Sequence, residues 1–334
     1  MKLDIVIPIY NEQDILQELH RRLCEVCDSL DSIGWQVIYI NDGSSDDSMK
    51  ILLEQCQNDT RISIIELSRN FGHQAAITVG LAHADGDAVV IMDGDLQDPP
   101  ELIPDLLSRW KDGAQIVRAE RRSRQERGIR RLGFGMFHKL FKWISDFPIP
   151  PNTGIFGLID KKAIKELNRL KEKNRFFPGL RSWVGFDQET VYYDRLDRAA
   201  GKPKQSLPRL FRYAFDAIFS FSYKPLRIMT VMGISISTVS FALATVFIIK
   251  RLAGIEIAQI GFTTLVTLIL FLGGIQLIAI GLLGEYLARV YDEVKERPLY
   301  IIKNKYGNLQ SVAELDHVSS SIIKGRTSNS SSSD

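Results

Sequence analysis

Two long stretches without a charged residue constrain this chain more than any other feature of its sequence. Residues 228–249 and 260–283 contain no Asp, Glu, Lys, Arg or His over 22 and 24 residues. An α-helix rises about 1.5 Å per residue, so each stretch can cross the roughly 30 Å hydrocarbon core of a membrane. Two buried core helices are the alternative, which uncharged stretches of this length disfavour. The sequence therefore predicts transmembrane helices over 228–250 and 259–284.

The charges around these stretches predict their orientation. Cations cluster before the first stretch and after the second, whereas the connector carries only Lys250 and Arg251. Positive charge marks the cytoplasmic side of a span. The N-terminal apolar run is too short for a signal peptide and is broken by Pro8. We therefore expect a multi-pass cell-membrane protein with two spans, whose soluble part and both termini are cytoplasmic.

The soluble part, residues 1–205, alternates between strand and helix patterns. Short apolar runs predict strands over 3–9, 36–40, 62–67, 88–92 and 114–117. Apolar residues at intervals of three or four predict helices between them, over 15–30, 72–84 and 101–111. Strands that alternate with helices indicate an α/β fold with a doubly wound, mainly parallel sheet.

Three of these strands end in polar loops, after Ile9, Ile40 and Met92. Carboxyl ends of parallel strands meet at one edge of the sheet, where ligands bind. In the third loop Asp93 and Asp95 are separated by one residue, and their oxygens suit Mg²⁺ or Mn²⁺ held against a diphosphate. No GxGxxG or GxxxxGK[ST] motif follows the first strand, so neither a Rossmann site nor a P-loop is supported.

Four motifs occur in order at the strand ends: Pro8-Ile-Tyr-Asn-Glu12, Asn41-Asp-Gly-Ser44, Arg69-Asn-Phe-Gly72 and Met92-Asp-Gly-Asp-Leu-Gln-Asp-Pro-Pro100. This combination resembles the family 2 glycosyltransferases of the GT-A fold. Later motifs between Ser182 and Arg227, followed by two spans, are similar to the polyprenyl-phosphate glycosyltransferases, the group of dolichyl-phosphate mannose synthase and bactoprenol glucosyltransferase. The resemblance covers about residues 1–300.

The resemblance implies a role for each matching residue. It implies that the nucleotide is bound by Pro8, Tyr10, Glu12, Asp42, Asp93 and Gln97, that the metal is bound by Asp93 and Asp95, and that the catalytic residues are Asp93, Asp95, Arg121 and Arg124. A guanidinium fork matches phosphate oxygens, so the cations that could bind the acceptor phosphate or the diphosphate are Arg121, Arg124, Arg195, Arg198 and Lys204. Of these, Arg195, Arg198 and Lys204 are expected at the acceptor phosphate.

The reaction implied is transfer of a sugar from a nucleotide diphosphate to a polyprenyl phosphate, with inversion. The divalent cation would neutralise the leaving diphosphate. Many relatives have Gly-Asp-Phe-Arg where this chain has Gly154-Ile-Phe-Gly157, so an Asp and an Arg are replaced by Ile155 and Gly157. A phosphate acceptor, with a second pKa of about 6, is already ionised and needs no general base. Asn41 also replaces a common Asp, while Asp42 is kept.

Three further segments complete the expected organisation. Residues 206–227 form an amphipathic pattern that predicts an interfacial helix. Residues 285–317 are expected to be a charged cytoplasmic juxtamembrane segment, and residues 318–334 a disordered Ser-rich tail.

Seven arginines between residues 118 and 131 raise the question whether this segment binds nucleic acid. Beside two spans, anionic headgroups and a phosphorylated lipid are the expected partners, and nucleic acid is not.

The identity of the donor is left open by the sequence. UDP-glucose is favoured because the whole chain resembles bactoprenol glucosyltransferases, with GDP-mannose as the alternative.

A processive polysaccharide synthase would need Q-x-x-R-W, and Leu106 stands at the Gln position before Arg109-Trp110. A catalytically inactive membrane adaptor is the alternative that Ile155 and Gly157 suggest. Because two spans bury little surface, we expect a homo-oligomer.

Overall fold

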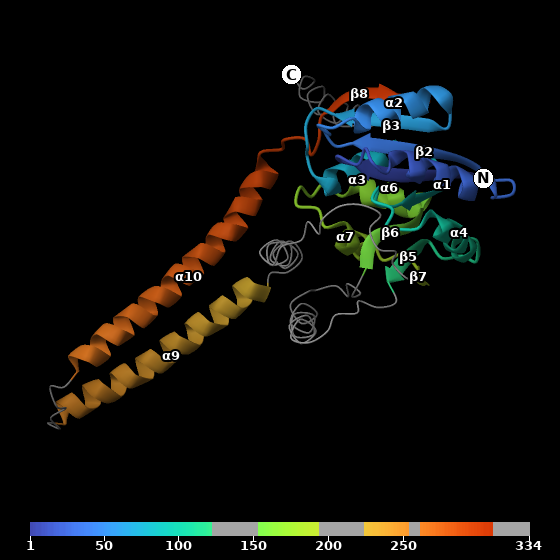
Figure 1. Ribbon diagram of the computed structural model, residues 1–334. Helices are drawn as coiled ribbons and strands as arrows, with labels where there is room; N and C mark the ends of the chain where they lie inside the picture. The colour runs from blue at the N-terminus through green and yellow to red at the C-terminus, as the bar shows by residue number, and fades with distance from the viewer. Residues whose placement is uncertain (122–152, 194–223, 254–260, 310–334) are drawn as a thin grey trace, which may run out of the picture.

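The structure is a computed structural model that describes residues 1–121, 153–193, 224–253 and 261–309. These residues form an α/β head from which a long pair of antiparallel helices projects (Figure 1). The chain enters the head at its N-terminus, leaves it for the helical pair, and returns to the head for its last described strand.

Eight described strands form one sheet in the order β7-β5-β6-β4-β1-β2-β3-β8. The central strands are parallel: β1 pairs with both β2 and β4, and β2 with β3. The eight strands are β1 Lys2–Ile9, β2 Gly34–Asn41, β3 Ile62–Leu67, β4 Ala88–Ile91, β5 Ile116–Arg121, β6 Thr153–Asp160, β7 Gln188–Tyr193 and β8 Ile302–Tyr306. The central strands are buried along almost their whole length because helices cover both faces, which explains their continuous Ile and Val runs.

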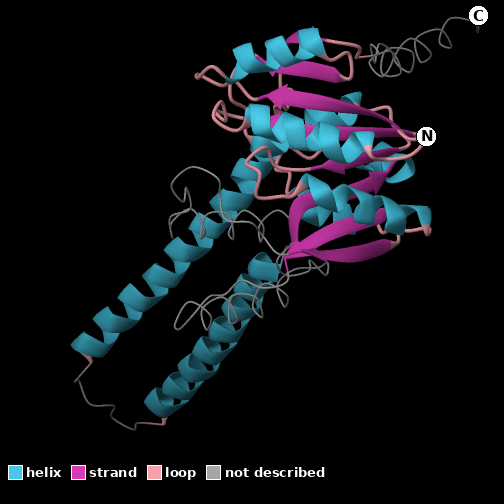
Figure 2. Ribbon diagram, turned by 45° about the vertical axis from the view of Figure 1, so that its right-hand side comes forward, coloured by secondary structure: helices cyan, strands magenta, loops and turns pink. Residues whose placement is uncertain are grey.

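Helices pack on both faces of the sheet (Figure 2). One apolar cluster joins the sheet to α1 Leu16–Asp28, α2 Ser48–Asn58 and, after the short 3₁₀ turn η1 Pro100–Leu102, α4 Ile103–Lys111. The second cluster joins the opposite face to α3 His73–His83, α6 Lys161–Arg169 and α7 Phe177–Trp183. The predicted fold class, an α/β fold with a mainly parallel sheet, is confirmed.

Three strands were not predicted from the sequence. Strand β6 lies antiparallel between β4 and β5, and β7 pairs in parallel with β5 at the sheet edge. Strand β8 pairs antiparallel with β3, so part of the expected juxtamembrane segment 285–317 belongs to the sheet. Its sequence, Ile-Lys-Asn-Lys-Tyr, is short and charged, as is typical of an edge strand.

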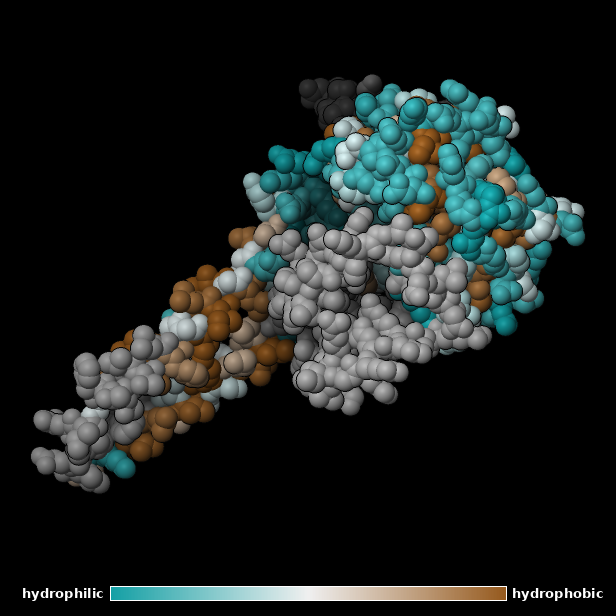
Figure 3. Space-filling model, viewed as in Figure 1, coloured by the Kyte–Doolittle hydropathy of each residue, from teal (hydrophilic) through white to brown (hydrophobic). Residues whose placement is uncertain are grey.

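The two predicted spans form α9 Lys224–Leu252 and α10 Phe262–Val294. Within them, Leu226–Leu243 and Phe271–Val294 are long and apolar enough to cross a membrane. Figure 3 shows hydrophobic side chains gathered on this pair and hydrophilic ones on the head. Among them Phe241 is 77% exposed and Leu277 71% exposed, so the described part of the chain leaves these side chains largely uncovered.

Candidate active site

A cavity of about 330 Å³ opens where β1, β2 and β4 end. The three polar loops therefore meet at one edge of the sheet, as the strand order requires. Six of the predicted site residues line this cavity: Pro8, Tyr10, Glu12, Asp42, Asp93 and Asp95. The remaining lining residues are Ile9, Asn70, Gly72, His73 and Gly94.

Side-chain hydrogen bonds hold the first two loops together. Asn11 adopts a left-handed conformation with φ 55°. Its backbone N–H donates to Ser44 Oγ at 3.1 Å, and its side-chain oxygen accepts the N–H of Ser45 at 2.8 Å. Asn41 Oδ1 accepts the N–H of Ser44 at 3.1 Å. Asn41 thus shapes the second loop, and an amide is sufficient for that contact.

Asp42 connects the end of β2 to the loop before α3. One carboxylate oxygen accepts the N–H of Phe71 at 2.7 Å and the other accepts the N–H of Gly72 at 2.9 Å. Gly43 allows this close approach, since a Cβ there would lie 2.6 Å from the backbone of Arg69. Burial raises the pKa of Asp42 above its usual range, against the opposing effect of the two amide donors. Each oxygen keeps a second lone pair that can accept a hydrogen bond from a nucleoside.

The third loop carries the pair of carboxylates predicted to bind metal. Asp93 accepts a hydrogen bond from His73 Nε2 at 2.8 Å, and Asp95 Oδ1 accepts the N–H of Gln97 at 3.1 Å. Burial lowers the pKa of His73, but the hydrogen bond to Asp93 and the charges of Asp93, Asp42 and Asp95 outweigh it, so the pKa is raised. Sequence reasoning missed His73, although it directly follows the Arg69-Asn-Phe-Gly72 motif.

Two predicted residues lie beside the cavity and do not line it. Gln97 is 6% exposed, and its described contact runs through its backbone N–H to Asp95. Arg121 ends β5 and lies next to Tyr193 and the buried Asp98. Burial, together with the negative charge of Asp93, raises the pKa of Asp98 to about 6.

The replaced Gly-Asp-Phe-Arg stretch lies on β6 near a buried arginine. Arg181 of α7 is fully buried and donates to the carbonyl oxygens of Ile155 at 3.3 Å and Gly154 at 3.2 Å. A Cβ at Gly157 would lie 2.4 Å from the carbonyl oxygen of Val117. No side chain fits there, so an arginine at position 157 is incompatible with this backbone. Burial lowers the pKa of Arg181 to about 9.

Several predicted residues lie outside the described part of the chain. They are Arg124, Arg195, Arg198 and Lys204, together with most of the expected interfacial helix 206–227 and the tail 318–334.

The donor atoms of the cavity suit a hard divalent cation. Mg²⁺ is commonly held by one or two carboxylates plus substrate phosphates and water. Asp93 and Asp95 supply the carboxylates, and both are partly accessible from the cavity. Elsewhere in the described residues, His20, Cys24 and Asp59 lie within metal-binding distance of one another. Both oxygens of Asp59 are engaged by Arg61 at 2.7 to 3.1 Å, which disfavours a cation there.

A mainly parallel sheet with a carboxylate-lined cavity at the ends of its central strands is the arrangement expected for a glycosyltransferase of the GT-A class. Residues 4–167 match the family described as Glycosyl transferase family 2. A glycosyltransferase of Synechocystis sp., the uncharacterized sll0501, is 45% identical over 309 residues, which cover 92% of this chain and 96% of that protein. This chain therefore belongs to glycosyltransferase family 2.

The similarity extends through the helical pair. The SfII prophage-derived bactoprenol glucosyl transferase of Shigella flexneri is 38% identical over 307 residues, which cover 92% of this chain and 99% of that protein. Among solved structures, S. aureus TarS 1–349 in complex with UDP-GlcNAc matches with a TM-score of 0.45 and 17% identity, covering 66% of each chain.

Proposed function

We propose that this protein is a membrane-bound inverting glycosyltransferase that moves glucose from UDP-glucose to the phosphate of a polyprenyl lipid at the cytoplasmic face. One observation carries the proposal: the similarity to a bactoprenol glucosyl transferase covers 92% of the chain, including both the cavity and the helical pair. GDP-mannose is the alternative donor, because a few hydrogen bonds to the sugar decide this choice.

Different residues of the cavity are expected to bind different parts of the donor. Pro8, Tyr10, Glu12 and Asp42 line the cavity and would bind the nucleoside, and Asp93 and Asp95, which also line it, would lie at the diphosphate of the donor. A Mg²⁺ or Mn²⁺ ion held by Asp93 and Asp95 would supply the positive charge that the leaving diphosphate needs. Gln97 fixes the geometry of this loop through Asp95.

The acceptor needs positioning more than it needs a base. A phosphate oxygen attacks the anomeric carbon, the bond from that carbon to the diphosphate oxygen breaks, and the nucleoside diphosphate leaves. Because the phosphate is already ionised near neutral pH, no proton has to be removed. An Ile at position 155, buried beside Arg181, is compatible with such a reaction. Arg121, Arg124, Arg195, Arg198 and Lys204 are the cations proposed to bind phosphate.

The proposed orientation places the head and both termini in the cytoplasm. The connector between the spans carries only Lys250 and Arg251, whereas cations are frequent on the head side of both helices. The exposed apolar side chains of α9 and α10 would then be covered by lipid or by a second copy of the chain.

The function is tested with detergent-solubilised protein, undecaprenyl phosphate and Mg²⁺ or Mn²⁺. Radiolabelled UDP-glucose, UDP-galactose, UDP-N-acetylglucosamine and GDP-mannose are each assayed for label in the organic phase. We expect UDP-glucose to label the lipid and Asp95→Asn to abolish the labelling. If folded protein labels no lipid with any donor, the proposal is wrong. Titration with UDP and Mn²⁺ then tests the inactive-adaptor alternative, for which no metal-dependent nucleotide binding is expected.

A further inference from the structure

A buried carboxylate lies directly behind the predicted metal loop, outside the cavity lining. Asp98 is 2% exposed. Its Oδ1 accepts a hydrogen bond from the hydroxyl of Tyr193 at 2.7 Å, and Arg121 Nη2 lies 4.0 Å from the same oxygen. Its Oδ2 lies 3.4 Å from the backbone N–H of Asp93. Asp98 therefore touches both the loop proposed to hold the donor and an arginine proposed to bind phosphate.

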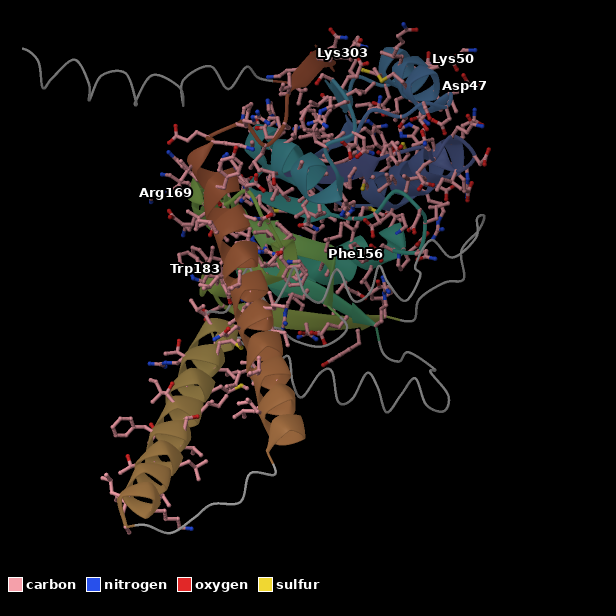
Figure 4. The ribbon with its side chains drawn as sticks, turned by 90° about the vertical axis from the view of Figure 1, so that its left-hand side faces the viewer. Asp47, Lys50, Phe156, Arg169, Trp183 and Lys303 are labelled. Atoms are coloured by element: carbon pink, nitrogen blue, oxygen red, sulfur yellow. The ribbon has the colours of Figure 1, made fainter. Side chains whose placement is uncertain are left out.

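Tyr193 holds the same arginine from the neighbouring strand. Arg121 and Tyr193 are register partners in the parallel pair β5 and β7, and Arg121 Nε donates to the tyrosine oxygen at 3.3 Å. The ring of Tyr193 packs edge-on against Phe156, with 5.7 Å between centroids and an interplanar angle of 85°. This packing fixes the position of the hydroxyl. Figure 4 shows Phe156 within the head, away from Lys303 at the β8 edge.

These contacts constrain one edge of the Arg121 guanidinium, formed by Nε and Nη2, and within the described residues Nη1 has no hydrogen-bond partner. The Nε atom is used by Tyr193, and the Nη2 edge faces Asp98. The Arg121 side chain is 22% exposed, so it is not fully buried. A buried carboxylate is costly unless it is paired and hydrogen-bonded, and the hydrogen bond from Tyr193 and the nearby charge of Arg121 offset part of this cost at Asp98. A guanidinium held in this way meets a phosphate with little further loss of rotamer freedom.

We infer that Tyr193 and Asp98 are positioning residues that hold Arg121 beside the donor loop, so that the N–H groups without a partner in the described part of the chain meet the phosphate of the lipid acceptor. This inference rests on the proposed function. It assigns Arg121 to the acceptor and not to the nucleotide, since neither Arg121 nor Asp98 is among the residues that line the cavity in which the donor is expected.

The test is Tyr193→Phe, which removes the hydroxyl and keeps the ring that packs on Phe156. We expect the KM for undecaprenyl phosphate to rise roughly tenfold, while the KM for the nucleotide sugar and the Mn²⁺-dependent affinity for UDP stay unchanged. Asp98→Asn keeps the shape and removes the charge, and it should shift the acceptor KM in the same direction. In an Arg121→Gln background, Tyr193→Phe should have no further effect, because coupled residues are not additive.

Thr190→Val is the matched control. Thr190 is the register partner of Arg118 on the same strands, and its hydroxyl accepts from Arg118 Nη2 at 3.1 Å. We expect its acceptor KM to match that of the wild type. An acceptor KM unchanged in Tyr193→Phe, or a Tyr193→Phe effect that persists in full beside Arg121→Gln, overturns the inference. A wild-type protein without transfer activity instead overturns the proposed function, so the two failures are distinguishable.

Discussion

His73 Nε2 lies 2.8 Å from Oδ1 of Asp93, so the first residue of α3 holds a carboxylate at the end of β4. Gly72, which precedes the helix, has φ 95° and donates its N–H to Asp42. The start of one helix thus fixes two acidic side chains from two different strands. Helix N-termini favour negative charge, which is consistent with this arrangement.

Replacing His73 should leave Asp93, a predicted metal ligand, less firmly positioned. In His73→Ala the carboxylate of Asp93 loses a hydrogen bond that, for a charged group, contributes about 1.5–3 kcal/mol. We expect the Mn²⁺-dependent affinity for UDP to fall about tenfold, as measured by isothermal titration calorimetry. His83→Ala is the control, because His83 lies on the same helix and bonds only to Val79 O among the described residues. Equal affinities in the two variants would contradict the role assigned to His73.

Asp42 should matter for stability as well as for the nucleotide. Its two oxygens accept separate backbone amides, from Phe71 and Gly72. Asp42→Asn leaves one carbonyl oxygen and places an NH₂ group against the other amide, so one buried donor loses its acceptor. We expect the free energy of unfolding to fall by about 1–3 kcal/mol, measured by thermal unfolding in detergent.

The control for Asp42→Asn is Asp47→Asn, the same chemical change at an exposed carboxylate that directly precedes α2 and makes no side-chain capping hydrogen bond. Figure 4 shows Asp47 at the surface beside Lys50. A melting temperature that falls as far in Asp47→Asn as in Asp42→Asn would mean that the two amide contacts are not the cause.

The stability that the edge strand β8 gains from its contacts with Glu66 should decrease at acidic pH. Partial burial raises the pKa of Glu66, but hydrogen bonds from Lys303 at 2.7 Å and Asn304 at 2.8 Å outweigh it, so the pKa is lowered. A carboxylate with a lowered folded pKa stabilises the fold above its unfolded pKa of about 4.5, and this contribution is lost as the pH falls through the folded value. Glu66→Gln should melt about 2–4 °C lower than the wild type at pH 7.

The melting temperatures of wild type and Glu66→Gln should converge as the pH falls below about 4.5. Glu54→Gln serves as the control, since Glu54 is exposed on α2 and its side chain makes no hydrogen bond or ion pair with any described residue. A difference between wild type and Glu66→Gln that stays constant from pH 7 to pH 3.5 would show that the charge of Glu66 does not hold β8.

The sequence predicts the parts of this fold that depend on local patterns. Runs such as Ile62–Leu67 have the length and composition of a buried strand, and the predicted bounds agree with β3. The convergence of Tyr10, Asp42 and Asp93 follows from the parallel strand order alone. These features need no knowledge of tertiary contacts.

Other features depend on contacts between distant segments, which no local pattern encodes. His73 is a site residue because Asp93, 20 positions away, lies against the start of α3. Strand β8 is held to β3 by Glu66, 237 positions from Lys303, and its charged sequence has no apolar alternation. Arg181 likewise acquires its surroundings only when α7 packs on β6.

The backbone around Gly157 bears on whether the arginine that the resemblance implies at this position can be accommodated. A Cβ on Gly157 would lie 2.4 Å from Val117 O and 3.2 Å from Arg181 Nη1, and both neighbours are buried. Gly157→Ala should therefore cost about 1–3 kcal/mol of unfolding free energy by overpacking, and Gly157→Arg should not fold. The control Gly113→Ala has φ 115° but no atom within 4 Å of the added Cβ, so it measures backbone strain alone. If Gly157→Arg folds with the stability of the wild type and transfers sugar faster, the backbone of β6 is not what excludes the arginine, and its absence limits catalysis.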